Sequence, residues 1–161
     1  MSKKKIKSRR RRPVAKIRLV GDPILKKVCD DVLPDENIEQ IERDMMYVLT
    51  GSKHGVGIAA NQVGYSKRII VVRLDGFYHT YINPVIEEFL GKKVDGVEGC
   101  LSVPKKFAKV FRFPGIIVTC SNIDEELIFN DFNAVVIQHE IDHLNGICKV
   151  ADYIPGDEDK T

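Results

Sequence analysis

Long apolar runs are missing from this sequence of 161 residues. No stretch approaches the roughly 20 apolar residues that a membrane-spanning helix requires, so we expect no membrane segment. The positive charges at the start of the chain are not followed by an apolar region, as they would be in a secretory signal. The same segment lacks the Ser-rich, amphipathic character of a transit peptide. These absences predict a cytoplasmic protein.

Closely spaced cysteines are also missing. The four cysteines stand far apart at Cys29, Cys100, Cys120 and Cys148, and no two of them form a C-x-x-C pair. In a chain without an export signal, this spacing indicates reduced thiols. A fold that depends on disulfide bonds is therefore excluded.

The composition is that of one globular domain. Hydrophobic residues make up 43% of the chain and charged residues 30%, which is ordinary for a globular protein. Neither an internal repeat nor a linker divides the sequence. We expect a single domain over residues 13–155, followed by a short acidic tail at residues 156–161.

Positive charge is concentrated in residues 1–12, whereas the whole chain carries a net charge of only +2. The simplest interpretation of this segment is a disordered, solvated tail. The alternative is an arm that contacts an anionic surface such as ribosomal RNA. The remaining chain is mildly acidic, and we expect no binding to DNA.

Hydrophobic periodicity predicts two helices and several short strands. The first helix opens at Pro34–Asp35 and ends at Gly51. The second is capped by Asn130 or Asp131 and stopped by Gly146. The pattern of short strands with one early and one late helix predicts an α+β fold. The predicted strands cover residues 69–74, 78–82, 85–90, 116–121 and 127–129, with a hairpin turn at 75–76 between the first two.

The stretch G-V-G-I-A-A-N-Q at residues 55–62 nearly matches a dinucleotide-binding fingerprint. That fingerprint follows a strand and opens a helix, whereas here a helix precedes it and Gly64 interrupts the segment after it. We therefore reject a nucleotide site. Small residues here instead allow the backbone to approach a ligand or another chain segment closely, and a tightly packed loop explains the same composition.

The second predicted helix carries the motif H-E-x-x-H. Residues four apart lie on one face of a helix, so His139 and His143 can hold one metal ion together. Glu140 lies beside them, where it can reach a water molecule bound to that ion. Apolar neighbours indicate a buried helix, where unpartnered polar groups are costly. A metal explains their presence, and a core helix with hydrogen-bonded histidines is the alternative.

A catalytic site of this kind needs a third protein ligand. In one metalloprotease pattern this ligand is a histidine at the position of Lys149, a cation that cannot bind a metal. A downstream carboxylate would have to come from the acidic tail, so the ligand is expected upstream. Candidates are His54, His79, the cysteines and many carboxylates, and the residues alone do not decide among them.

Three stretches together resemble, in order and spacing, the signature motifs of peptide deformylases. They are G-V-G-I-A-A-N-Q at 55–62, E-G-C-L-S at 98–102 and Q-H-E-I-D-H-L-N-G at 138–146. The resemblance implies a fold of short antiparallel β-sheets packed around a central H-E-x-x-H helix. It implies a metal-dependent hydrolase that removes the formyl group from N-formylmethionyl peptides of newly made proteins and releases formate. It also implies that ferrous iron is the physiological metal, with zinc, nickel or cobalt able to substitute.

The same resemblance assigns roles to individual residues. Water bound to the metal attacks the formyl carbon, a carboxylate acts as general acid and base, and two N–H donors bind the oxyanion. The residues implied are Cys100, His139 and His143 as metal ligands, Glu140 as the acid and base, and the Gln62 side-chain amide and Leu101 backbone N–H as the donors.

The resemblance further implies how the peptide binds. Its backbone would lie as an added strand against Val56, Gly57 and Gly99, where glycine leaves room for it. Its methionine side chain would enter an apolar pocket. One wall of this pocket would be the face of the second helix that lies N-terminal to His139. The wall of that pocket would include Phe132, Val135 and Val136.

Two features depart from the family pattern. Many members continue into a long C-terminal helix that helps them dock on the ribosome, whereas only a short segment follows Gly146 here. The basic tail is then the candidate for ribosome contact, and the short C-terminus is similar to compact deformylases such as those of phages. Phe107 stands where bacterial relatives often carry Arg, which predicts a changed peptide preference beyond methionine.

Asp142 lies on the predicted metal helix but points away from the ligand face. A charge near a hydrophobic core requires a partner. We therefore expect an ion pair between Asp142 and Arg112.

Two other functions compete with the deformylase. A metalloprotease of another type is disfavoured by the missing downstream ligand. A metal-binding or ribosome-binding module without activity is disfavoured because Gln62, Cys100 and Glu140 are all present, and binding alone requires no general base.

Overall fold

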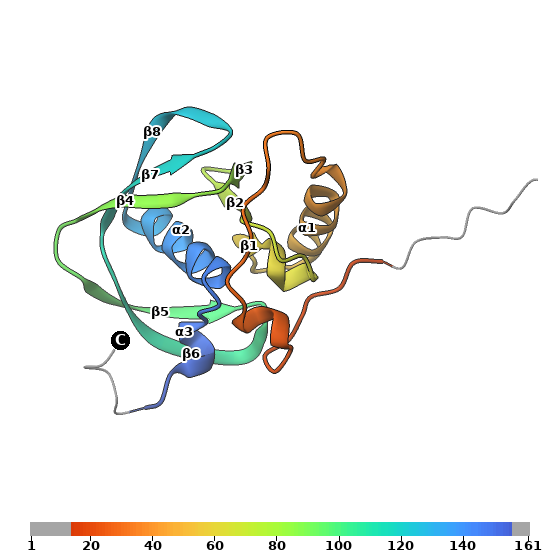
Figure 1. Ribbon diagram of the computed structural model, residues 1–161. Coiled ribbons are helices and arrows are strands. Elements are labelled where there is room, and N and C mark those ends of the chain that lie inside the picture. The colour runs from red at the N-terminus through yellow and green to blue at the C-terminus, as the bar shows by residue number, and fades with distance from the viewer. Residues whose placement is uncertain (1–13, 156–161) are drawn as a thin grey trace, which may run out of the picture.

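The described part of the chain has an α+β fold, as the sequence predicts. The computed structural model describes residues 14–155 (Figure 1), so the predicted tails at 1–12 and 156–161 lie outside it. Over the described range, no helix is both long and apolar enough to cross a membrane. The elements follow in the order η1 (Pro23–Lys26), α1 (Glu39–Gly51), β1 (Gly57–Ala59), η2 (Ala60–Val63), β2 (Ile69–Leu74), β3 (Phe77–Ile82), β4 (Val85–Leu90), β5 (Val94–Cys100), β6 (Val103–Arg112), β7 (Gly115–Cys120), β8 (Ile123–Asn130), α2 (Asp131–Leu144) and α3 (Lys149–Asp152), where η marks a 3-10 helix.

Antiparallel sheets lie around helix α2 (Figure 1). One sheet has the strand order β1-β2-β3 and another the order β4-β7-β8, while β5 and β6 form a long hairpin of their own. Helix α2 contacts β1 and β2 on one side and β7 and β8 on the other. The metal-motif helix is therefore placed between two sheets, with the β5–β6 hairpin alongside.

Strand β2 is the shared wall of two hydrophobic clusters. Ile70 and Val72 pack in the cluster around α2, whereas Ile69 and Val71 pack in the cluster that contains the buried face of α1. Successive side chains of a strand point to opposite faces. Because both faces of β2 are covered, its sequence is a nearly continuous apolar run.

The strand predictions are correct where apolar residues dominate. Those at 69–74 and 85–90 match β2 and β4, and the hairpin turn is confirmed by positive φ angles at Asp75 and Gly76. The sequence does not predict β1, β5 or β6. Strand β5 contains two glycines and buries only Glu98, so it lacks the alternation that marks a half-buried strand.

Helix α1 begins later than the sequence predicts. The predicted start at Pro34–Asp35 is wrong, because the helix begins at Glu39. The Glu36 carboxylate accepts a hydrogen bond from the Leu33 backbone N–H and another from Lys67, which holds the preceding residues in a turn. The helix ends at Gly51, as predicted.

Helix α2 begins after Asn130, which occupies the predicted N-cap position, although its side chain forms no capping hydrogen bond within the described residues. The helix ends at Leu144, and Gly146 follows with a φ of 74°, where glycine is favoured. A Cβ atom at Gly146 would lie 2.6 Å from the Lys26 carbonyl oxygen. This glycine therefore also lets the end of α2 pack against η1.

Candidate metal centre

Helix α2 presents His139, Glu140 and His143 toward the interior of the molecule. Apolar residues of the same helix, such as Ile137 and Leu144, have no exposed surface and fix its rotation. As a result, Glu140 is only 4% exposed and His143 only 1%. Polar side chains this deeply buried need partners inside the protein.

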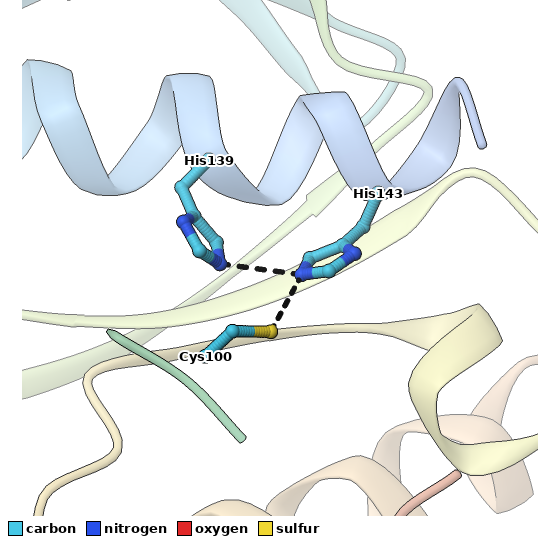
Figure 2. Close-up of side chains that lie close together, drawn as sticks. All are labelled: Cys100, His139 and His143. Carbon is cyan, nitrogen blue, oxygen red and sulfur yellow. Dashed lines mark hydrogen bonds between the residues drawn. The ribbon is translucent and has the colours of Figure 1, made fainter. Parts of the chain in front are cut away.

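Cys100 stands at the end of β5, and its side chain points toward the two histidines (Figure 2). The strand register shifts between Gly99 and Cys100, an irregularity of the kind that re-aims a side chain. Cys100 Sγ lies 3.2 Å from His143 Nε2, which lies 3.2 Å from His139 Nε2. All three atoms lie within 4.8 Å of one another. The structure thus brings together the three side chains that the resemblance implies as ligands.

The other upstream histidines lie apart from this group. His54 and His79 are exposed, and neither belongs to a cluster of potential metal ligands in the part of the chain that the structure describes. The four cysteines are free thiols, as the sequence predicts. Of these histidines and cysteines, Cys100 is the one whose ligand atom clusters with those of His139 and His143 in the described chain.

A buried ion-pair network supports His139. Glu98 accepts a hydrogen bond from His139 Nδ1 at 2.8 Å and two from the Arg112 guanidinium at 2.8 and 3.0 Å. Arg112 also donates to Asp142, which confirms the ion pair predicted from the sequence. Burial opposes the negative charge of Glu98, but the hydrogen bonds from His139 and Arg112 outweigh it and lower its pKa to about 2.

The hydrogen bond to Glu98 sets the tautomer of His139. An ionised carboxylate only accepts hydrogen bonds, so Nδ1 carries the proton and, in the neutral ring, Nε2 offers its lone pair to the cluster. Carboxylate–histidine pairs of this kind orient metal ligands in proteins. Glu98 does not stand out in the sequence, and its only signal is that it shares the E-G-C-L-S motif with Cys100.

Glu140 lies directly against strand β1. A Cβ atom at Gly57 would lie 2.5 Å from a Glu140 carboxylate oxygen. From the sequence, Gly57 is expected to leave room for a substrate. In the structure, the absence of a side chain at Gly57 leaves room for the Glu140 carboxylate. Burial raises the pKa of Glu140 to about 7, a value suited to proton transfer near neutral pH.

Unpartnered polar atoms occur at the same place. Glu140 Oε2 and His143 Nδ1 are buried and have no hydrogen-bond partner within residues 14–155. Burial and the neighbouring His139 lower the pKa of His143 to about 3, so its ring is neutral. The Cys148 thiol and burial raise the pKa of Cys100, so a thiolate there requires a nearby cation. Two imidazoles and a sulfur that converge in this way fit a divalent transition metal.

Gln62 faces the cluster from η2 and is only 2% exposed. Its Oε1 accepts a hydrogen bond from the Ala59 backbone N–H at 2.9 Å. The amide is thereby oriented so that Nε2 donates to Ser102 Oγ at 3.0 Å and to Cys100 Sγ at 3.7 Å. Leu101 directly follows Cys100, so its backbone belongs to the same edge of the cluster.

The residues implied in binding the peptide backbone lie on β1 and β5, or directly before β1, beside the cluster. Val56 and Gly57 stand at β1, an edge strand that pairs with β2 in the described sheet. Gly99 is exposed on β5, opposite Phe107 of β6. A Cβ atom at Gly99 would lie 3.0 Å from the Phe107 ring, and Phe107 is 70% exposed. An exposed aromatic side chain therefore lies next to the proposed path of the peptide.

The residues implied in the methionine pocket differ in exposure. Phe132 is 61% exposed and Val136 only 5%, while Val135 is half-buried. Val136 packs in the cluster around α2. These three residues of α2 thus range from buried to exposed. Their contact with a methionine side chain stays a prediction.

Known proteins resemble this chain over most of its length. A family model described as polypeptide deformylase matches residues 14–158. A peptide deformylase of Pseudothermotoga lettingae is 40% identical over 146 residues, which cover 88% of this chain and 84% of that protein. The structure of the peptide deformylase from Vibrio parahaemolyticus bacteriophage VP16T, in complex with actinonin, has a TM-score of 0.77 and 35% identity, and covers 83% of this chain and 98% of that one. The structure of a class I type b peptide deformylase from Acinetobacter baumannii, bound to Met-Ala-Ser, has a TM-score of 0.78 and 33% identity. The match covers 88% of this chain and 99% of that one.

Proposed function

Because this chain belongs to the polypeptide deformylase family, we propose that Cys100, His139 and His143 hold the metal ion on which its activity depends. The chain is a metal-dependent hydrolase that removes the formyl group from the N-terminus of formylmethionyl peptides. The observation that carries the residue assignment is the convergence of one sulfur and two imidazole nitrogens beside a buried carboxylate.

Ferrous iron is the metal that we propose for the working enzyme. The resemblance to the family supports iron, and the donor set of one sulfur and two imidazoles also accepts zinc, nickel or cobalt. When bound, a divalent metal supplies a Lewis acid that lowers the pKa of water and polarises a carbonyl group. Glu98 and Arg112 hold the His139 ring in the orientation that this role requires.

Glu140 is the proposed general acid and base. It takes a proton from the water that attacks the formyl carbon and later passes that proton to the leaving amine. The products are formate and a free amino terminus. The same carboxylate thus acts as the base when water attacks and as the acid when the amine leaves. The pKa of about 7 that burial gives Glu140 supports both steps.

Gln62 and Leu101 are the proposed donors to the oxyanion. Negative charge develops on the formyl oxygen in the transition state, and N–H groups aimed at it stabilise that charge. The Gln62 amide is fixed by Ala59 and Ser102 with its nitrogen toward the cluster. A neutral amide donates without adding a charge that would repel the metal.

The substrate peptide is proposed to add as a strand between β1 and β5. Val56, Gly57 and Gly99 would contact its backbone, and the relative solved with Met-Ala-Ser supports a methionyl peptide in this role. The methionine side chain would lie against the α2 face. That face carries Phe132, Val135 and Val136.

We also propose that the enzyme acts in the cytoplasm, where formylmethionyl chains are made. The basic segment at residues 1–12 is proposed to contact ribosomal RNA, because its charge complements a phosphate surface. Cross-linking of the full chain to ribosomes at low and high salt tests this contact. Salt-independent association, or none, would contradict it.

Formate release from formyl-Met-Ala-Ser tests the function directly. The full chain, loaded with ferrous iron under anaerobic conditions, should release one formate for each new free amino group. The same protein after chelation should be inactive and should recover when iron is returned. A protein that binds metal at Cys100, His139 and His143 but releases no formate would contradict the proposal.

A further inference from the structure

A second cysteine lies beside the proposed sulfur ligand. The Sγ atoms of Cys148 and Cys100 are 4.0 Å apart, and both residues are half-buried. Cys148 does not belong to the group of converging ligand atoms in the described chain, which contains Cys100 with the two histidines. The Cys148 sulfur therefore lies next to the Cys100 sulfur but is not one of the proposed metal ligands.

The structure holds Cys148 at this position through the segment after it. Val150 has no exposed surface and packs with Val103 and Val110 of the hairpin. Lys106 Nζ donates to the carbonyl oxygens of Ala151 at 2.9 Å and Tyr153 at 3.2 Å. The packing of Val150 and the hydrogen bonds of Lys106 thus hold α3 against the strand pair that carries Cys100.

Cys29 and Cys120 provide a contrast within the same molecule. Cys29 is buried in the hydrophobic cluster around α2, and Cys120 packs against that cluster. Burial raises the pKa of each thiol to about 11, and among the described residues the sulfur–sulfur contact joins Cys148 to Cys100 and involves neither of these two. They serve as matched controls for a reaction that requires two sulfur atoms in contact.

We propose that Cys100 and Cys148 are a modification site at which peroxide forms a reversible disulfide bond. Hydrogen peroxide converts one thiol to a sulfenic acid and releases one water molecule. The sulfur of the other cysteine then attacks the sulfenic sulfur, its proton and the departing hydroxyl form a second water, and the S–S bond is made. The two thiols lose two electrons and two protons in total, and the peroxide accepts them.

The disulfide would have a specific consequence for the metal centre. A sulfur–sulfur bond is about 2 Å long, so the two side chains must move toward each other, and the Cys100 sulfur is then no longer available to a metal. Cys148 also intercepts the sulfenic acid before it proceeds to the irreversible sulfinic and sulfonic acids. Formation of the disulfide is independent of the proposed function, whereas loss of metal rests on the proposed role of Cys100.

The test uses the full chain loaded with zinc, which does not itself react with peroxide. After treatment with hydrogen peroxide and blocking of free thiols, the protein should have lost two hydrogen atoms, and peptide mapping should link Cys100 to Cys148. Zinc should appear in solution in proportion to the disulfide. Dithiothreitol should then restore both thiols and zinc binding.

Cys148→Ser and Cys120→Ser complete the experiment. Cys120→Ser should behave like the parent chain. Cys148→Ser should accumulate sulfinic and sulfonic acid at Cys100, and dithiothreitol should restore less than about one tenth of its zinc binding. Parent protein that accumulates these acids while Cys148 stays free would overturn the proposal. A linked pair that keeps its zinc would support the modification site and overturn Cys100 as a ligand.

Discussion

Helix α2 and the β5–β6 hairpin meet at the proposed metal centre, but they are held in place in different ways. The histidines of α2 rest on fully buried apolar residues such as Ile137 and Leu144. Strand β5, by contrast, buries only Glu98, and the hairpin is joined to α2 through the contacts of Arg112 with Asp142 and of Glu98 with His139. Apolar packing positions one half of the site, and ion pairs position the other.

This difference predicts how each half responds to change. Apolar packing is non-directional, and cores tolerate substitutions that conserve volume. A buried charged network is less tolerant, because removing one member leaves the others without a partner. The hairpin half of the site should therefore depend on a few specific atoms, whereas the helix half depends on the volume and shape of its neighbours.

The largest effect is expected when the hairpin loses its sulfur. Cys100→Ala should abolish metal retention. It should reduce formate release by more than the roughly 10–100-fold that is typical when a residue hydrogen-bonded to a metal ligand is lost. Elemental analysis and a formate assay measure the two effects. The circular dichroism spectrum should not change, because this side chain is only half-buried. Tight metal binding by the variant would mean that another residue completes the ligand set.

On the helix half, Glu140→Gln should separate metal binding from chemistry. The amide has nearly the same shape as the carboxylate but cannot accept the proton, so turnover should fall about 10²–10⁴-fold while the metal stays bound. Glu88→Gln changes an exposed carboxylate and is the matched control. Full turnover by the Glu140 variant would mean that the general base is elsewhere.

The connection between the two halves is tested by Arg112→Met. Arg112 is 4% exposed and its guanidinium pairs with Glu98 and Asp142, so its loss should lower the free energy of unfolding by about 3–5 kcal/mol. Urea denaturation of the metal-free chain measures this. Arg112→Lys keeps the charge without the planar fork and should be intermediate. Unchanged stability in both variants would contradict the importance of the network.

The smallest effect is expected on the outer face of the hairpin. Phe107 is 70% exposed, so Phe107→Ala should change stability by less than about 0.5 kcal/mol. It should raise KM for formylmethionyl peptides with an apolar second residue more than for those with a charged one, because a ring contact is lost. Phe77→Ala, at a residue that is 71% exposed, is the control. Equal KM changes in the two variants would remove Phe107 from peptide recognition.

The two halves also differ in how much the sequence reveals of them. His139 and His143 belong to one helix, so their local spacing is enough to place them on one face. The apolar run of β2 is equally plain, because both of its faces are buried. Composition could not select Cys100 from the upstream candidates, and only the resemblance to a known family did so.

Partners that are distant in the sequence explain what was missed. Asp142 and Arg112 could be paired because a charge near a core requires a partner, and the structure confirms that pair. Glu98 gave no such signal, since its position on a mostly exposed strand hides its burial. The contact of Cys148 with Cys100 depends on how α3 docks, and no local pattern encodes that docking.

The distances along the chain that the site must bridge have a consequence for folding. Cys100 and His143 are 43 positions apart, and the Asn61 side chain, which donates to the His143 carbonyl oxygen at 2.6 Å, is 82 positions away. Such non-local contacts form only after the entropy of closing long loops has been overcome. The full set of proposed ligands is therefore assembled only in molecules that are nearly native. A metal ion bound to that set stabilises the finished fold by mass action and does not act as a nucleus for folding.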